Sequence, residues 1–173
     1  MRVGILTVSD RSFRGEREDL GGPALQRAVY DGWELHAREE QRGVKVAATA
    51  IVPDERGTIA AKLVEWCDGE RLDLILTTGG TGFAPRDVTP EATLDVIERH
   101  APGLAEAIRL ESLRITLHAM LSRGVAGIRG RTLIVNLPGS PRGAVESLAV
   151  IMPVLPHAVE LLREDAAAEQ HHR

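Results

Sequence analysis

Cysteines and aromatic residues are scarce in this 173-residue chain. Cys67 is the only cysteine, which excludes an internal disulfide and any zinc site built on paired cysteines. Two Trp, two Phe and one Tyr leave few rings on which nucleobases could stack. Basic charge is not in excess either, because 21 Lys and Arg stand against 25 Asp and Glu, a net charge of −4. A nucleic-acid binder needs a basic face, so we expect no nucleic-acid partner.

Long hydrophobic runs are also missing. The run Val3–Val8 is too short for a secretory signal and is followed by no small-residue cleavage site. The longest apolar stretch elsewhere, residues 148–156, contains two prolines and falls far short of the roughly 20 residues that span a bilayer. The sequence therefore predicts a cytoplasmic protein with no membrane partner.

The length and composition fit one ordinary globular domain. A domain typically has about 150 residues, and 43% apolar with 27% charged residues is close to average usage. We expect a single domain over residues 1–163, followed by a polar, disordered tail over residues 164–173.

Short β-branched runs alternate with longer amphipathic segments along the chain. Four runs predict strands: Val3–Val8, Val44–Val52, Leu72–Leu76 and Thr132–Leu137. Such alternation is typical of βαβ units, which form a parallel sheet with helices on both faces. We therefore predict a three-layer α/β/α fold with a mostly parallel central sheet. A small β-hairpin, in which Val125–Ile128 pairs with the last strand, completes this prediction.

Helical spacing of apolar residues predicts five helices between and after these strands. Their expected ranges are Pro23–Glu40, Thr58–Asp68, Thr89 to the break at Pro102-Gly103, Leu104–Leu113 and Arg142–Arg163. The third should have Thr89 as its cap and Pro90 in its first turn, where the helix needs no N–H. The last should be irregular at Pro153 and Pro156.

Turn-forming and polar residues follow each predicted parallel strand. The four segments are Ser9-Asp10-Arg11-Ser12, Pro53-Asp54-Glu55, Thr78-Gly79-Gly80-Thr81-Gly82 and Pro138-Gly139-Ser140-Pro141. In open α/β sheets, ligands bind beyond the carboxyl ends of the strands. One such segment would be ordinary loop chemistry, but four together predict a binding site at this edge of the sheet.

The glycine-rich segment Thr78–Gly82 has two interpretations. Glycine tolerates positive φ, so the segment can serve simply to turn the chain. Its bare backbone amides can instead cradle an anion such as a phosphate. The chain has no Gly-Lys-Ser/Thr, which excludes a Walker P-loop, and Gly80-Thr81-Gly82 lacks the third glycine of a dinucleotide fingerprint.

Asp54 and Asp87 accompany this segment and also have two interpretations. Singly, each is a turn or capping aspartate. Together, two carboxylates beside an anion-binding loop would repel a phosphate, by about 4 kcal/mol at roughly 4 Å and an effective dielectric of about 20. A Mg²⁺ ion between them reverses the sign, and one or two carboxylates with substrate phosphates are its usual ligands. The pair therefore indicates metal-assisted phosphoryl or nucleotidyl transfer.

Other chemistry-bearing residues give weaker signals. The histidines show no metal-ligand spacing, and we interpret them and Cys67 as surface or core residues. Arg86 and Arg123 are candidates for phosphate contacts, although exposed arginines seldom have a specific role.

Taken in order, these motifs resemble the MogA/MoaB family, which includes the G domains of gephyrin and of the plant molybdenum-cofactor protein. The segments that carry the resemblance are Thr7-Val8-Ser9-Asp10, Val52-Pro53-Asp54-Glu55, Thr78-Gly79-Gly80-Thr81-Gly82, Arg86-Asp87-Val88-Thr89-Pro90-Glu91-Ala92-Thr93 and Leu137-Pro138-Gly139-Ser140-Pro141. The resemblance runs over residues 3–163. Spacing departs from the family only between Tyr30 and Gly43 and in the tail.

The resemblance implies molybdopterin adenylyltransferase activity, in which AMP passes from ATP to the terminal phosphate of molybdopterin. It places the family's essential acidic pair on Asp54 and Asp87, as catalytic residues and Mg²⁺ ligands. Substrate- and nucleotide-binding positions would fall on Ser9, Asp10, Thr78, Gly79, Gly80, Thr81, Gly82, Glu91, Ser112, Ser122, Pro138, Gly139 and Ser140. We expect a homotrimer, or a hexamer as in some MoaB-type members. We also expect a separate metal-insertion protein, because the fused domain of the plant and animal proteins is missing.

Two other interpretations stay open. A MoaB-like member of the family can bind pterin or partner proteins as a scaffold without catalysing adenylylation. A nucleotide-cleaving enzyme of the CinA type shares the fold in its first domain, but that family normally continues into a second domain. The presence of both Asp54 and Asp87 favours the adenylyltransferase.

Overall fold

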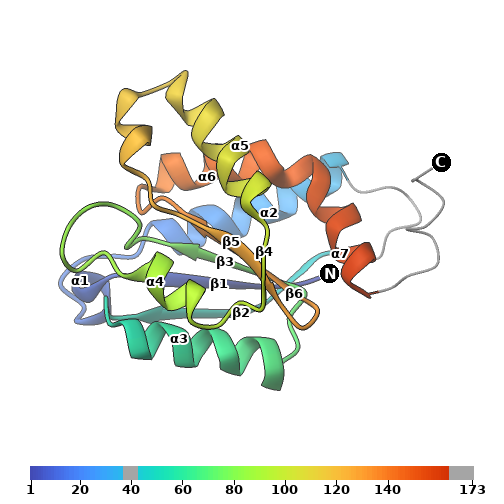
Figure 1. Cartoon of the computed structure of the whole chain (residues 1–173), viewed down its shortest axis with the longest axis horizontal. Helices are drawn as coiled ribbons and strands as arrows, with labels where there is room; N and C mark the ends of the chain where they lie inside the picture. The colour runs from blue at the N-terminus through green and yellow to red at the C-terminus, as the bar shows by residue number, and fades with distance from the viewer. Residues whose placement is uncertain (37–42, 164–173) are drawn as a thin grey trace.

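The computed structural model describes residues 1–36 and 43–163 and contains a six-stranded sheet in the order β2-β1-β3-β6-β5-β4 (Figure 1). The strands are β1 (Arg2–Val8), β2 (Lys45–Val52), β3 (Leu74–Thr78), β4 (Arg99–His100), β5 (Ala126–Arg129) and β6 (Thr132–Leu137). The four strands β2, β1, β3 and β6 run parallel, while β5 and β4 are antiparallel to their neighbours. The predicted α/β fold with its small hairpin is confirmed.

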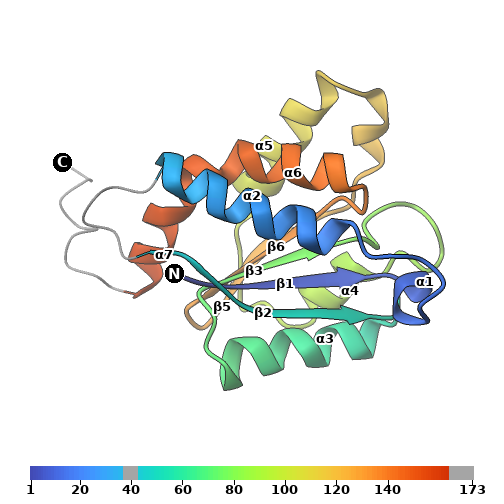
Figure 2. The same cartoon turned by 180° about the vertical axis from the view of Figure 1, so that it is seen from behind.

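Helices cover both faces of this sheet. They are α1 (Asp10–Phe13), α2 (Gly21–His36), α3 (Arg56–Val64), α4 (Thr89–Leu94), α5 (Pro102–Leu113), α6 (Pro141–Ile151) and α7 (Leu155–Arg163). A π-helical turn, η1 (Glu65–Gly69), extends α3, and two 3₁₀ turns, η2 (Leu117–Leu121) and η3 (Met152–Val154), follow α5 and α6. Figure 2 shows α2 and α6 on one face and α3 on the other.

Side chains of the central strands alternate between two hydrophobic cores, one on each face. In β3, Leu74 and Leu76 pack with helices α2, α5, α6 and α7, whereas Ile75 packs with α3 and α4. All three side chains are fully buried, and each such burial is worth about 1.5–3 kcal/mol. Two covered faces explain why this strand is almost continuously apolar in sequence.

Two predicted boundaries shift in the structure. Strand β3 lies two residues later than the predicted Leu72–Leu76. The helix from Thr89 ends at Leu94 and does not continue to Pro102, because the chain turns there into β4, which pairs with β5. The helix predicted over Pro23–Glu40 has its predicted end outside the described residues, and the predicted tail over residues 164–173 also lies outside them.

Thr89 does not cap α4 as predicted. Val88 occupies the cap position, without a side-chain hydrogen bond, and Thr89 is the first helical residue. Its Oγ1 instead donates to the backbone carbonyl of Gly79 at 2.9 Å. The hydroxyl therefore joins α4 to the glycine-rich turn.

The stretch Pro141–Arg163 is long and apolar enough to cross a membrane, with a mean hydropathy of 1.5. In the structure it is interrupted at Met152–Val154, where the predicted irregularity at Pro153 is confirmed. Its apolar residues Leu148, Ile151 and Leu155 are buried against the sheet. The stretch is therefore a core element of this domain.

Candidate functional site

The four parallel strands end at one level. Val8 is paired with Val52, Thr7 with Thr78, and Thr78 with Leu137. The polar segments that follow these strands consequently lie along one edge of the sheet. This is the edge at which the sequence predicted a binding site.

The turn after β3 requires glycine. Gly79 and Gly80 have φ values of 104° and 63°, which residues with a Cβ rarely adopt. A Cβ on Gly79 would collide with the carbonyl oxygen of Val8, and one on Gly80 with the hydroxyl of Thr89. The backbone N–H of Thr89 also donates to the Gly80 carbonyl at 3.1 Å. The turn is thus both bare and held against the start of α4.

The backbone N–H groups of Gly80, Thr81 and Gly82 donate no hydrogen bond within the described part of the chain. Unpaired amides on consecutive residues form a concave donor site for anions. The turn can therefore accept a phosphate.

Asp54, after β2, reaches this turn from one side. Its backbone N–H donates to Asp10 Oδ1 at 3.0 Å, and its Oδ2 accepts the backbone N–H of Asp10 at 2.7 Å. Its Oδ1 lies 3.2 Å from the position that a Cβ on Gly80 would take. Burial raises the pKa of Asp54; the Asp10 hydrogen bond opposes this rise, and the charges of Asp10 and Asp87 add to it.

Asp87 reaches the same turn from the other side. A Cβ on Gly82 would lie 2.8 Å from Asp87 Oδ2, and this oxygen accepts the backbone N–H of Ala84 at 2.9 Å. Asp54 and Asp87 both line one cavity beside the turn. The two carboxylates that the sequence singled out therefore converge on the glycine-rich segment.

The remaining oxygens of this pair suit a divalent cation. Oδ1 of Asp54 and Oδ1 of Asp87 accept no hydrogen bond from any described residue. Among those residues, no cluster of three or more His, Cys, Asp or Glu side chains could hold a metal alone. One or two carboxylates completed by ligand oxygens are a usual set for Mg²⁺, so these two side chains could hold such an ion.

Asp10 differs from Asp54 because its charge is neutralised. Arg86 donates from Nε and Nη2 to the two oxygens of Asp10 at 2.9 and 2.8 Å. Burial would raise the pKa of Asp10, but Arg86 and the Asp54 amide outweigh it and lower the pKa. Arg86, which the sequence left as a phosphate candidate, is already engaged by this pair.

Arg123 holds the glycine-rich segment in place, a role that the sequence did not reveal. Its Nε donates to the carbonyl of Gly82 at 2.7 Å, and its other nitrogens bind the Asp87 carbonyl and the Glu91 carboxylate. Its own N–H donates to the Thr81 carbonyl at 2.9 Å. These partners lie 32 to 42 positions away, so no local pattern announces them.

Asn136 is a second residue that sequence reasoning missed. It is buried in β6, and its Nδ2 donates to the hydroxyls of Thr77 and Thr93 at 3.0 and 2.9 Å. Thr93 in turn donates to the Thr89 carbonyl at 2.9 Å. This chain of hydrogen bonds links the sheet to α4 and so to the glycine-rich turn.

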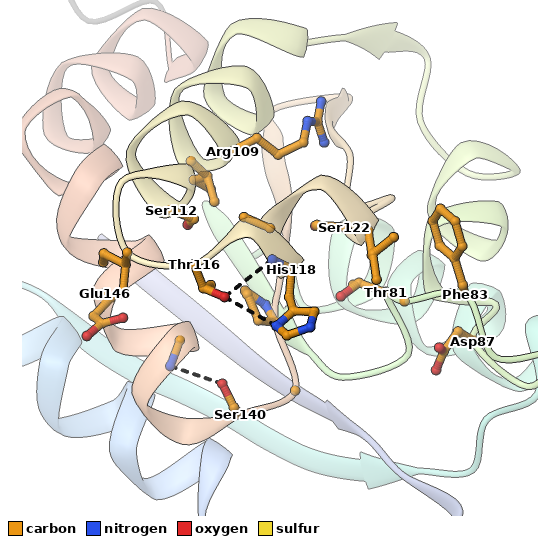
Figure 3. Close-up of a pocket in the computed structure, with 18 of the residues that line it drawn as sticks. Thr81, Phe83, Asp87, Arg109, Ser112, Thr116, His118, Ser122, Ser140 and Glu146 are labelled. Atoms are coloured by element: carbon orange, nitrogen blue, oxygen red, sulfur yellow. Dashed lines mark hydrogen bonds between the residues drawn. The ribbon is translucent and has the colours of Figure 1, made fainter.

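Two adjoining cavities open at the turn. The serine chamber, of about 490 Å³, is bounded by α5, η2 and the start of α6 and contains Ser112 and Ser122 (Figure 3). The aspartate chamber, of about 630 Å³, lies beside β1 and the start of α2 and contains Asp54. Both chambers are lined by Gly80, Asp87, Gly139 and Ser140. A group bound in one chamber can therefore meet a group bound in the other beside Asp87.

Most predicted binding residues line these chambers. The serine chamber has Gly80, Thr81, Gly82, Ser112, Ser122, Pro138, Gly139 and Ser140, and the aspartate chamber has Ser9, Thr78, Gly79, Gly80, Gly139 and Ser140. Asp10 and Glu91 line neither chamber. They form ion pairs with Arg86 and Arg123. His118, interpreted from sequence as a surface or core residue, lines the serine chamber, and its Nδ1 lies 3.3 Å from Thr116 Oγ1 (Figure 3).

Residues 4–157 match the family described as a probable molybdopterin binding domain. The chain is 46% identical over 164 residues to the molybdenum cofactor synthesis protein cinnamon of Drosophila melanogaster, covering 95% of this chain but 26% of that protein. It is 41% identical over 162 residues to the molybdopterin adenylyltransferase of Helicobacter pylori strain J99, and the match covers 94% of this chain and 88% of that protein.

A solved structure agrees with these sequence matches. The chain superposes on the molybdopterin biosynthesis enzyme MoaB of Thermus thermophilus with a TM-score of 0.83 and 55% identity. The superposition covers 95% of this chain and 97% of that one.

Proposed function

The chain belongs to the MogA/MoaB family of molybdopterin-binding domains, and we infer that it is a molybdopterin adenylyltransferase of molybdenum cofactor biosynthesis. In the proposed reaction an oxygen of the terminal phosphate of molybdopterin forms a bond to the α-phosphorus of ATP. The bond from that phosphorus to the bridging oxygen of the β-phosphate breaks. Adenylyl-molybdopterin and pyrophosphate are the products.

One observation carries the proposal: two carboxylates from opposite loops converge on a turn in which three amides donate to no described residue. Asp54 and Asp87 would hold Mg²⁺ through the oxygens that no described residue engages. Bound there, the ion would offset negative charge on the transferring phosphoryl group.

The chain's own groups position the reactants. The amides of Gly80, Thr81 and Gly82 would bind phosphate oxygens. Arg123 holds the carbonyls of Thr81 and Gly82, and the Thr89 N–H holds that of Gly80. Positioning and electrostatic stabilisation can supply most of the acceleration in such a transfer, so no covalent enzyme intermediate is needed.

The two chambers suit two substrates. We propose that the serine chamber receives the pterin, because Ser112, Ser122 and Thr116 offer hydroxyls to its ring edge and phosphate. The aspartate chamber then receives ATP. Asp87, which lines both, stands where the attacking phosphate would meet the α-phosphate.

The test is direct. Purified protein is incubated with molybdopterin, ATP and Mg²⁺, and adenylyl-molybdopterin and pyrophosphate are measured, with Asp87→Asn as the inactive control. Both products should form in equal amounts, and none without Mg²⁺. Pterin binding without product would indicate the scaffold, and nucleotide cleavage in the absence of pterin would indicate the CinA-type reaction.

Assembly and cellular place belong to the same proposal. Leu110, Leu117 and Met120 on α5 and η2 are 65%, 72% and 62% exposed, an apolar surface that suits contacts between subunits. We propose a cytoplasmic homotrimer, or a hexamer, that passes its product to a separate metal-insertion protein. Size-exclusion chromatography with light scattering distinguishes monomer, trimer and hexamer.

A further inference from the structure

Phe83 is an exposed aromatic side chain beside the proposed reaction centre. It follows the glycine-rich turn directly, lines the serine chamber and is 66% exposed. In Figure 3 it stands near Thr81 and Asp87 at one end of the chamber, while Ser112 and Glu146 stand at the other. The chain has only one other phenylalanine.

The backbone on either side of Phe83 is firmly held. The Gly82 carbonyl accepts from Arg123 Nε, and the N–H of Ala84 donates to Asp87 Oδ2 at 2.9 Å. The Ala84 carbonyl in turn accepts the N–H of Asp87 at 2.8 Å. The fold therefore fixes the backbone from which the ring projects, and the ring belongs to neither core.

The rest of the chamber complements a flat heterocycle. Its wall contains the apolar side chains Ile108, Ile115 and Leu121 together with the hydroxyls of Ser112, Thr116 and Ser122. Apolar walls with a few placed polar groups are typical of small-molecule sites. An aromatic face next to such hydroxyls can stack on a ring while the hydroxyls bind the ring's edge.

We propose that Phe83 stacks on the planar nitrogen heterocycle of a substrate and thereby holds that substrate beside Asp87. The inference rests on the proposed function, whose two substrates both carry such a ring, pterin in one and adenine in the other. Because Phe83 lies in the chamber with Ser112 and Ser122, the pterin is the expected partner.

The kinetic test compares four variants. Phe83→Ala should raise KM for molybdopterin by about 5- to 100-fold and change kcat little, since stacking holds substrate and transition state alike. Phe83→Tyr should retain the wild-type KM, whereas Phe83→Leu, apolar but without a π face, should not. Phe13→Ala is the matched control: Phe13 is 56% exposed and lines neither chamber.

The outcomes separate the two rings. A raised KM for molybdopterin assigns the pterin, and a raised KM for ATP assigns the adenine. The proposal is overturned if neither KM rises, or if Phe83→Leu matches the wild type, because a plain apolar contact would then suffice.

A binding experiment keeps this test independent of turnover. Phe83→Trp adds an exposed indole to a chain whose two tryptophans, Trp33 and Trp66, are buried. Titration with molybdopterin or ATP alone should quench its fluorescence saturably, beyond any change in Phe13→Trp. If the wild type forms no product, the proposed function fails, and this titration alone decides stacking: absence of quenching with both ligands overturns it.

Discussion

Two half-buried aspartates lie at opposite ends of the sheet and have different partners. Asp73, at the amino end of β3, accepts from Arg163 Nε and Nη2 at 2.8 and 2.5 Å and from the Arg2 amide at 2.5 Å. Asp54, at the carboxyl end of β2, accepts only the Asp10 amide among the described residues and receives no bond from a cation. One carboxylate is neutralised by an arginine within the fold, and the other has no hydrogen bond from a cationic side chain among the described residues.

The pKa of each group follows from these partners. Burial alone would raise the pKa of Asp73, but the hydrogen bonds from Arg163 and Arg2 outweigh it and lower the pKa. Burial raises the pKa of Asp54, and no ion pair reverses the rise. The folded protein thus favours the charge of Asp73 and disfavours that of Asp54. An aspartate that is costly to the fold at neutral pH suits a functional role better than a structural one.

Of the changes that test this comparison, removing the charge of Asp54 should have the largest effect on the reaction. Asp54→Asn keeps the shape and an oxygen for the Asp10 amide but removes the Mg²⁺ ligand. We expect the rate of pyrophosphate release to fall by about 100- to 1,000-fold while the melting temperature stays equal or rises. Glu55→Gln, a neighbouring carboxamide that lines neither chamber, is the control. Activity near that of the control would contradict the role of Asp54.

Loosening the glycine-rich turn should have the second largest effect on the reaction. Arg123→Gln removes hydrogen bonds to the Gly82 and Asp87 carbonyls, so the carboxylate and the amides lose their relative positions. We expect kcat/KM to fall by up to about 100-fold and stability by about 2 kcal/mol. The control is Arg56→Gln, because Arg56 forms an exposed pair with Asp95. Equal effects of the two substitutions on kcat/KM would refute the positioning role.

The sequence singled out Asp54 and Asp87 but gave Arg123 only as a candidate for phosphate contacts and missed its hydrogen bonds to the glycine-rich segment. The reason is physical. Each carboxylate follows or precedes a recognisable turn, and parallel topology alone brings strand ends together. Arg123 acts through carbonyls 41 and 36 positions away, and hydrogen bonds across such separations leave no periodic trace. The helix and strand patterns predicted the layers because each buried element has an apolar face that repeats along the sequence. They missed β4 because its two residues, Arg99 and His100, are exposed and form no apolar pattern.

Removing the charge of Asp73 should test the other aspartate of the comparison, at the amino end of β3. Asp73→Asn loses the ion pair with Arg163, which is partly exposed. We expect a loss of about 1–2 kcal/mol, or about 3–6 °C in melting temperature, with an unchanged rate of pyrophosphate release. Calorimetry and the product assay measure the two. A loss of rate at equal stability would show that this end also serves the reaction.

Acidification should produce the smallest effect and sharpen the comparison, because the pKa of Asp73 is shifted down and that of Asp54 is shifted up. The folded pKa of Asp73 is lowered, so the stability it contributes is complete above its unfolded pKa of about 3.8 and disappears as pH falls through the lowered folded value. The folded pKa of Asp54 is raised, so its charge destabilises the fold at neutral pH and this cost fades as pH falls through the raised value towards 3.8.

Urea unfolding of the wild type, Asp73→Asn and Asp54→Asn between pH 7 and pH 3 measures both differences. At neutral pH, Asp73→Asn should be less stable than the wild type and Asp54→Asn more stable, each by about 1.4 kcal/mol per unit of pKa displacement at most. On acidification the Asp54→Asn difference should shrink first, and the Asp73→Asn difference should persist to lower pH. Two differences of the same sign would mean that the carboxylate beside the glycine-rich turn is neutralised within the fold, and the contrast between the two ends of the sheet would be lost.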